Sequence, residues 1–146
     1  MPGITVGVDG SDHSKLALER AIKEAGIHRA PLTVLTVHQA VVGYAGGPVT
    51  YPEDPTETEA AREAAQAETD KLLAEYDGPR PESVTIKAVH GFPAEELVNA
   101  SRDADIVVLG SRGAGGFKPL LMGSVTSQVA HHAHCPILIV PPENRG

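Results

Sequence analysis

Short runs of apolar, often β-branched residues alternate along the chain with longer segments whose apolar residues recur every three or four positions. Most of the short runs are continuously apolar, which is typical of parallel strands covered on both faces. We therefore expect an α/β protein with five strands joined by crossover helices. The expected strands are Ile4–Val8, Leu32–Val37, Val84–Val89, Ile106–Leu109 and Pro136–Val140.

Four helices are predicted between these strands. They cover the apolar positions from Leu18 to Ala25, the segment from Thr56 (after Asp54-Pro55) to about Tyr76, about Pro93 to Ser101, and Gly123-Ser124 to His132. In the first helix, Ser11, Asp12 or Ser14 can cap the start, and Gly26 is expected at the C′ position. The segment Val42–Pro52 has no clear period and is expected to be an irregular loop.

The order of these elements favours an open, doubly wound sheet with strand order 3-2-1-4-5, as in Rossmann-like folds. The helices after strands one and four then leave toward opposite faces of the sheet, which opens a crevice where ligands of such sheets bind. Val8, Asp9 and Gly10 follow the first strand into this crevice, and residues 110–113 follow the fourth.

The segment GSRGAGGFKPLLMGSVTS, residues 110–127, is the most informative stretch for function. Its glycines allow the backbone to approach an anion closely, and the helix expected to follow offers unpaired N–H groups at its positive dipole end. We expect phosphates at the amides of Ser124, Val125 and Thr126, with the hydroxyls of Ser124 and Thr126 as further donors. Arg112 supplies a neighbouring positive charge.

Two residues on other strands complete the expected site. The carboxylate of Asp9 can accept a ribose hydroxyl or, through water, help to hold Mg²⁺. Val37 can offer its backbone N–H and C=O to an adenine edge. Two simpler interpretations remain open: Asp9 caps the first helix, which is compatible with ribose binding, and the glycine segment is a surface connection without a ligand.

The net charge limits which partners the protein is expected to bind, and the cysteine content bears on the compartment in which it is expected. A formal net charge of -7 with only 12 dispersed basic residues disfavours duplex nucleic acid but not mononucleotides. The single cysteine, Cys135, cannot form an intramolecular disulfide, and we expect it to be buried. With no leader-like or membrane-spanning run in this sequence, we expect one cytoplasmic domain over residues 1–146.

Two groups of polar residues are expected to have structural rather than functional roles. His131, His132, His134 and Cys135 fall at a helix end and a strand start, so no metal site is expected there. The remaining histidines, among them His38 and His90, are expected to be exposed or satisfied locally. On the second helix, a solvated face is expected from Arg62, Glu63, Glu68, Asp70 and Lys71.

Neither GxxxxGK[ST] nor GxGxxG is present, so another phosphate-binding pattern is required. The spacing G-x2-G-x9-G-[ST], supplied by Gly110, Gly113 and Gly123-Ser124, resembles that of the ATP-binding subset of the universal stress protein family. VGVDGSDHS at residues 6–14 and CPILIV at residues 135–140 extend the resemblance over the whole chain.

The resemblance implies an adenine nucleotide α-hydrolase-like fold with ATP, and Mg²⁺ near Asp9, as ligands. It implies that Asp9 contacts ribose, Val37 adenine, and the glycine segment the phosphates. The expected binding residues are Val8, Asp9, Val37, Leu109, Gly110, Arg112, Gly113, Gly123, Ser124, Val125 and Thr126. It further implies a homodimer that pairs through Pro136–Val140, where an unprotected sheet edge would otherwise invite association.

We therefore expect an ATP-binding regulatory or sensor module with an unknown protein partner. No positioned general base or Walker-type lysine is evident, so any hydrolysis should be slow. ATP is expected to act by ordering residues 113–123 and Val42–Pro52. The alternatives are a nucleotide α-hydrolase-like enzyme that uses Asp9 or Ser11, a nucleotide-free dimeric scaffold, and AMP or a cyclic nucleotide as the ligand.

Overall fold

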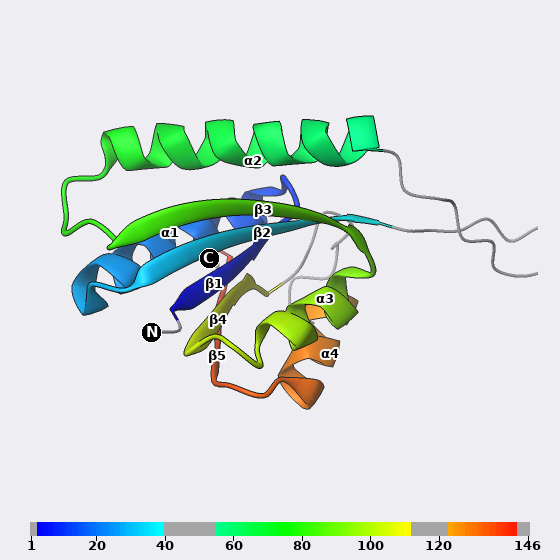
Figure 1. Ribbon diagram of the computed structural model, residues 1–146. Coiled ribbons are helices and arrows are strands. Elements are labelled where there is room, and N and C mark those ends of the chain that lie inside the picture. The colour runs from blue at the N-terminus through cyan, green and yellow to red at the C-terminus, as the bar shows by residue number, and fades with distance from the viewer. Residues whose placement is uncertain (1–2, 40–54, 112–122, 143–146) are drawn as a thin grey trace, which may run out of the picture.

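The computed structural model describes residues 3–39, 55–111 and 123–142. Its strands are β1 (Ile4–Val8), β2 (Pro31–Gln39), β3 (Ser83–Gly91), β4 (Ile106–Gly110) and β5 (Ile137–Val140), and its helices are α1 (Asp12–His28), α2 (Pro55–Glu75), α3 (Pro93–Ala100) and α4 (Ser124–His132). All paired strands are parallel, and their order is β3-β2-β1-β4-β5, which confirms the predicted fold class (Figure 1). The predicted loop Val42–Pro52 and Asp54 lie outside the described residues.

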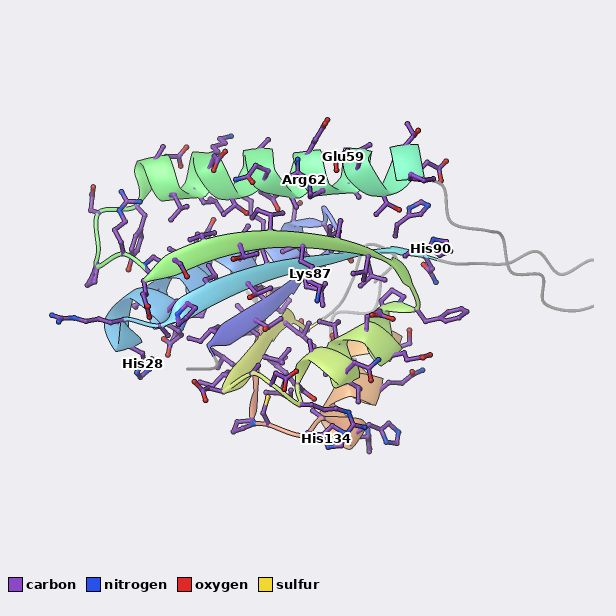
Figure 2. The ribbon with its side chains drawn as sticks, in the orientation of Figure 1. His28, Glu59, Arg62, Lys87, His90 and His134 are labelled. Atoms are coloured by element: carbon purple, nitrogen blue, oxygen red, sulfur yellow. The ribbon has the colours of Figure 1, made fainter. Side chains whose placement is uncertain are left out.

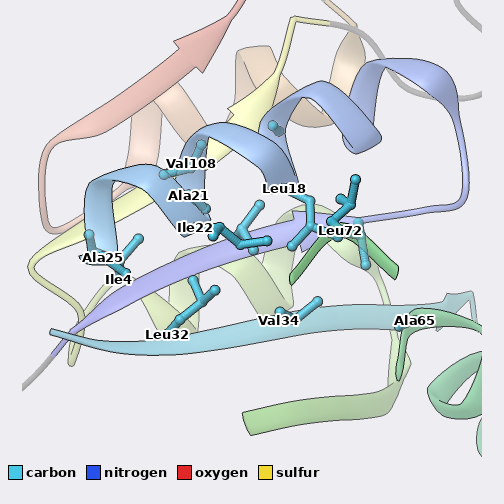
Figure 3. Close-up of a cluster of buried hydrophobic side chains, with 13 residues drawn as sticks. Ile4, Leu18, Ala21, Ile22, Ala25, Leu32, Val34, Ala65, Leu72 and Val108 are labelled. Carbon is cyan, nitrogen blue, oxygen red and sulfur yellow. The ribbon is translucent and has the colours of Figure 1, made fainter. Parts of the chain in front are cut away.

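Two helical layers cover the sheet, with α1 and α2 on one face and α3 and α4 on the other (Figure 1). Because side chains alternate along a strand, each strand contributes to both cores. Val34 packs in the α1/α2 core, whereas its neighbour Leu35 packs in the α3/α4 core. Figure 3 shows Leu18 and Ile22 of α1 against the sheet in the first core. The helices after β1 and β4 thus leave toward opposite faces, as the topology requires.

The end of α1 corrects one prediction. The helix does not stop at Gly26 but continues to His28, and Arg29 takes the left-handed cap conformation with φ 53°. Gly26 is buried inside the helix, where an added Cβ would lie 1.8 Å from the carbonyl oxygen of Pro79. This glycine therefore allows the connection before β3 to pass close to the helix backbone.

Two expectations about exposure are also wrong. Glu68 does not belong to a fully solvated face: it is half-buried between α2 and α1, and burial is the first cause of its raised pKa, while Lys15 lowers the pKa. Cys135 is half-buried rather than buried, and it packs at the margin of the α3/α4 core. Burial raises the pKa of its thiol, and the backbone of Val107 lowers it. Across the described residues, no helix is long and apolar enough to cross a membrane.

Candidate functional site

A cavity of about 710 Å³ opens at the carboxyl ends of β1, β2 and β4. This volume falls within the range of about 300–1,000 Å³ that is usual for small-molecule sites. The predicted binding residues that line it are Val8, Asp9, Val37, Leu109, Gly110, Gly123, Ser124, Val125 and Thr126. The other predicted residues, Arg112 and Gly113, lie outside the described residues. Residues far apart in sequence therefore meet at the expected edge of the sheet.

One wall of the cavity is apolar. Val37 and Leu109 form it together with residues that the sequence interpretation missed: Leu35, Pro93 and Leu97. Gly7 keeps this wall open, because an added Cβ would lie 2.9 Å from Leu109 Cδ2 and 3.0 Å from Leu97 Cδ2. Leu35 could have been found from strand alternation, since it lies two positions before Val37 and shares its face.

The start of α4 forms the opposite, polar end. Gly123 is the N-cap residue, and no side chain caps the helix there. The N–H groups of the first turn have no carbonyl partner within the helix, whose own ladder begins when Ser127 N–H donates to Gly123 O at 2.9 Å. α1 has a serine cap and an acid in its first turn, and α3 has two acids there, whereas α4 has neither. Of these three helices, α4 is the one best suited to an anion.

The side chain of Thr126 corrects a further prediction. Its hydroxyl was expected to donate to phosphate, but it is buried and donates instead to the carbonyl oxygen of Gly110 at 2.8 Å. Thr126 thereby fixes the start of α4 against the end of β4, and only its backbone N–H can face an anion. Gly110 is also packed tightly, because an added Cβ would lie 2.7 Å from the carbonyl oxygen of His13.

Asp9 lies across the cavity in the turn between β1 and α1. Its Oδ1 accepts hydrogen bonds from the Ser11 N–H at 2.9 Å and from the Ser11 hydroxyl at 2.5 Å. Ser11 is the N-cap of α1, since its Oγ accepts from the Ser14 N–H at 3.2 Å. Asp9 therefore positions the cap but is not the cap, and its exposed carboxylate faces the cavity. Gly10, with φ 83°, turns the chain at this point.

The end of β2 continues past its neighbour β1. Val8, the last residue of β1, pairs with Thr36, whereas Val37, His38 and Gln39 continue beside β3 alone. Val37, His38 and Gln39 have no partner on β1, so backbone groups of this stretch that point toward β1 can meet a ligand. The placement is compatible with the expected role of Val37 toward an adenine edge.

His38 also lines the cavity, and the sequence interpretation did not assign it to the site. Its Nε2 lies 2.8 Å from Glu57 Oε2 at the start of α2, and its ring centroid lies 5.7 Å from that of His90 on β3. His90 was expected to be exposed or satisfied, but its buried Nδ1 has no hydrogen-bond partner among the described residues. Within residues 3–39, 55–111 and 123–142, no three His, Cys, Asp or Glu side chains form a group that could hold a metal ion.

A family model described as the universal stress protein family matches residues 2–141. The chain belongs to the universal stress protein family. A universal stress protein of Mycolicibacterium smegmatis is 33% identical to it over 147 residues, which cover 99% of this chain and 49% of that protein. The chain thus spans about half the length of the first curated relatives that it matches.

Solved structures of universal stress proteins share its architecture. One, in complex with cAMP, is 25% identical, with a TM-score of 0.67 and 96% of both chains covered. Another, from Archaeoglobus fulgidus in complex with dAMP, is also 25% identical, with a TM-score of 0.59 and coverage of 95% of this chain and 97% of that chain. These relatives of the present universal stress protein bind adenine nucleotides.

Proposed function

We propose that this universal stress protein binds ATP in the cavity at the carboxyl ends of β1, β2 and β4 and acts as a nucleotide-dependent regulatory module. The observation that carries the proposal is the juxtaposition of an apolar wall and an uncapped helix start within one cavity of about 710 Å³. A nucleotide has the matching division into a flat, weakly polar base and an anionic tail. The adenine nucleotides in two structural relatives support this choice.

The two ends of the cavity define the orientation of the ligand. The base lies against Leu35 and Leu97 beside the backbone of Val37, and the phosphates lie at the first-turn amides of α4. Asp9, between these ends, accepts a ribose hydroxyl. Because Oδ1 of Asp9 already accepts two hydrogen bonds from Ser11, Mg²⁺ carried by the phosphates would meet this carboxylate through water.

The same proposal includes a homodimer in the cytoplasm. β5 is an edge strand, and all four of its apolar residues, Ile137 to Val140, are only partly buried. Such an edge is a template for pairing with a second strand, so we assign this edge to a second copy of the chain. A monomer mass at all concentrations in analytical ultracentrifugation would contradict the dimer and leave the nucleotide site unaffected.

Calorimetric titration with ATP tests the binding function. Gly123 has φ -67°, so Gly123→Val adds bulk at the cavity wall without backbone strain. We expect wild-type protein to release heat on binding ATP, and the variant to bind much more weakly while it stays folded. Because valine is a poorer N-cap than glycine, its melting temperature should be somewhat lower than that of wild-type protein. No heat from wild-type protein with ATP would leave the nucleotide-free scaffold as the better function. AMP and cAMP in parallel titrations show how much the phosphate tail contributes.

A further inference from the structure

β3 forms the second edge of the sheet, on the opposite side from β5 (Figure 1). It is nine residues long, whereas β5 has four. Its residues pair with β2 without interruption from Ser83 to Gly91, so no bulge bends the strand away from a neighbour. Long, regular edges of this kind are templates for the addition of another strand.

Half of the backbone groups of β3 point away from β2. The N–H of Glu82, just before the strand, donates to the carbonyl oxygen of Ala30 at 3.0 Å. Because successive residues of a strand direct their N–H and C=O groups to opposite sides, the even-numbered residues of β3 face β2 and the odd-numbered residues face outward. Thr85 and Lys87 are therefore the outward residues in the middle of the strand. Within the described part of the chain, no backbone group outside β2 is hydrogen-bonded to β3.

The two faces of the sheet differ in polarity along this edge. Toward α2, Val84 and Ile86 pack against the α1/α2 core but remain half-buried. On the other face Thr85 and Lys87 are exposed, and Figure 2 shows Lys87 on the side of β3 away from α2. A strand laid beside β3 would therefore cover apolar surface with every second side chain and place the others beside Lys87.

The charge of Lys87 indicates what such a strand should carry. Apart from His90, Lys87 is the only ionisable residue of β3, and no described residue forms an ion pair with it. An acid directly opposite on an added strand would lie on the same face and pair with it. A second copy of the chain has no acid in either edge strand, since β3 contains none and β5 reads ILIV. The edge therefore favours a strand from a different protein.

We propose that the outer edge of β3 binds an extended peptide segment of another protein, in which an acidic residue lies between apolar residues. The segment is added to the sheet as a sixth strand, held by main-chain hydrogen bonds to Thr85 and Lys87. Its acid faces Lys87, and its apolar neighbours cover Val84 and Ile86. No residue of β3 lines the cavity at the ends of β1, β2 and β4, so this surface is separate from the proposed nucleotide site.

Fluorescence anisotropy with the labelled peptide Val-Thr-Val-Glu-Val-Thr-Val tests the pairing with Lys87. The control peptide has lysine in place of the glutamate. We expect wild-type protein to prefer the glutamate peptide by about fivefold and Lys87→Glu to prefer the lysine peptide instead, a reversal that damage to the fold cannot imitate. Lys23→Glu makes the same change of charge at an exposed position of α1 and should keep the wild-type preference. A preference that stays the same in Lys87→Glu would overturn the proposal.

Amide hydrogen exchange shows whether the peptide binds as a strand. With saturating glutamate peptide, the N–H groups of Thr85 and Lys87 should exchange several-fold more slowly, whereas those of Val84 and Ile86, which face β2, should change little. Unchanged exchange at Thr85 and Lys87, or no binding at about 1 mM peptide, would overturn the proposal. Slower exchange at both amides as the protein concentration rises without peptide would assign the edge to a second copy and overturn it as well.

Discussion

The hydroxyl of Thr126 donates to the carbonyl oxygen of Gly110 across 2.8 Å, and this bond joins the first turn of α4 to the last residue of β4. Replacing Thr126 with valine keeps the shape but leaves the Gly110 carbonyl without its partner. We expect Thr126→Val to lower the free energy of unfolding by about 1–3 kcal/mol in urea titrations. Thr126→Ser keeps the hydroxyl and should recover most of that loss; a loss in Thr126→Ser with none in Thr126→Val would show that the methyl group, and not the hydrogen bond, is responsible.

The first amide of α4 can be removed without removing the helix. Ser124 is the first helical residue, a position at which proline is well tolerated, as Pro93 of α3 illustrates. We expect Ser124→Pro to weaken ATP binding by about tenfold or more, because a hydrogen bond to a charged group contributes about 1.5–3 kcal/mol.

Asp12→Pro is the matched control for this experiment, since it removes the equivalent amide of α1, whose residue does not line the cavity. Its ATP affinity should stay close to that of wild-type protein. If both proline variants bind ATP as wild-type protein does, the amides of α4 are not the phosphate ligands.

The raised pKa of Glu68 predicts how the stability of the protein depends on pH. Burial, together with the nearby Asp9, Asp12 and Glu19, raises its pKa, while Lys15 lowers it. The folded state therefore holds the proton more tightly than the unfolded state. The contribution of protonated Glu68 to the free energy of unfolding is fully present below the unfolded-state pKa and is lost as the pH rises through the folded-state pKa. At pH 7 the ionised group is thus unfavourable in the folded protein.

We expect Glu68→Gln to raise the melting temperature at pH 7 by about 1 °C, a small effect because the group is partly solvated. The gain should shrink as the pH falls toward about 4. Glu63→Gln, at an exposed position of the same helix, serves as the control. A gain that does not change between these pH values would contradict the electrostatic cause.

Cys135 should react slowly with alkylating reagents. Burial raises the pKa of its thiol, and the nearby Asp105 raises it further, so little thiolate is present at neutral pH. We expect labelling by iodoacetamide at pH 7.5 to be slower in the folded protein than in protein unfolded in urea, with mass spectrometry as the readout. Equal rates in the two states would show that the thiol is not shielded.

Much of the fold follows from local patterns in the sequence. The continuous apolar runs place the five strands, and β5 begins one residue later than expected, at Ile137. Pro136 still contributes its carbonyl, which accepts a hydrogen bond from Val107 N–H at 3.1 Å. The strand order followed from the handedness of the crossovers, and this order brought Asp9, Val37 and the start of α4 to one edge.

The errors arise where a residue responds to a distant segment. Gly26 lies opposite Pro79, and only a residue without a side chain leaves room for the Pro79 backbone there. The spacing of apolar residues along α1 does not reveal this contact. The partner of the Thr126 hydroxyl is on another element, and the carboxylate beside His38 is that of Glu57 on α2. Local sequence rules cannot supply such contacts, because they depend on how the elements pack.

Ser111 makes two backbone hydrogen bonds that bind three elements into one unit. Its N–H donates to the carbonyl of Val140 at 3.0 Å, and its carbonyl accepts from Gly123 N–H at 2.8 Å. Val140, the last residue of β5, and Gly123, the N-cap of α4, are therefore both hydrogen-bonded to Ser111. A displacement of either one strains the other, so the start of α4 is held in place by the sheet.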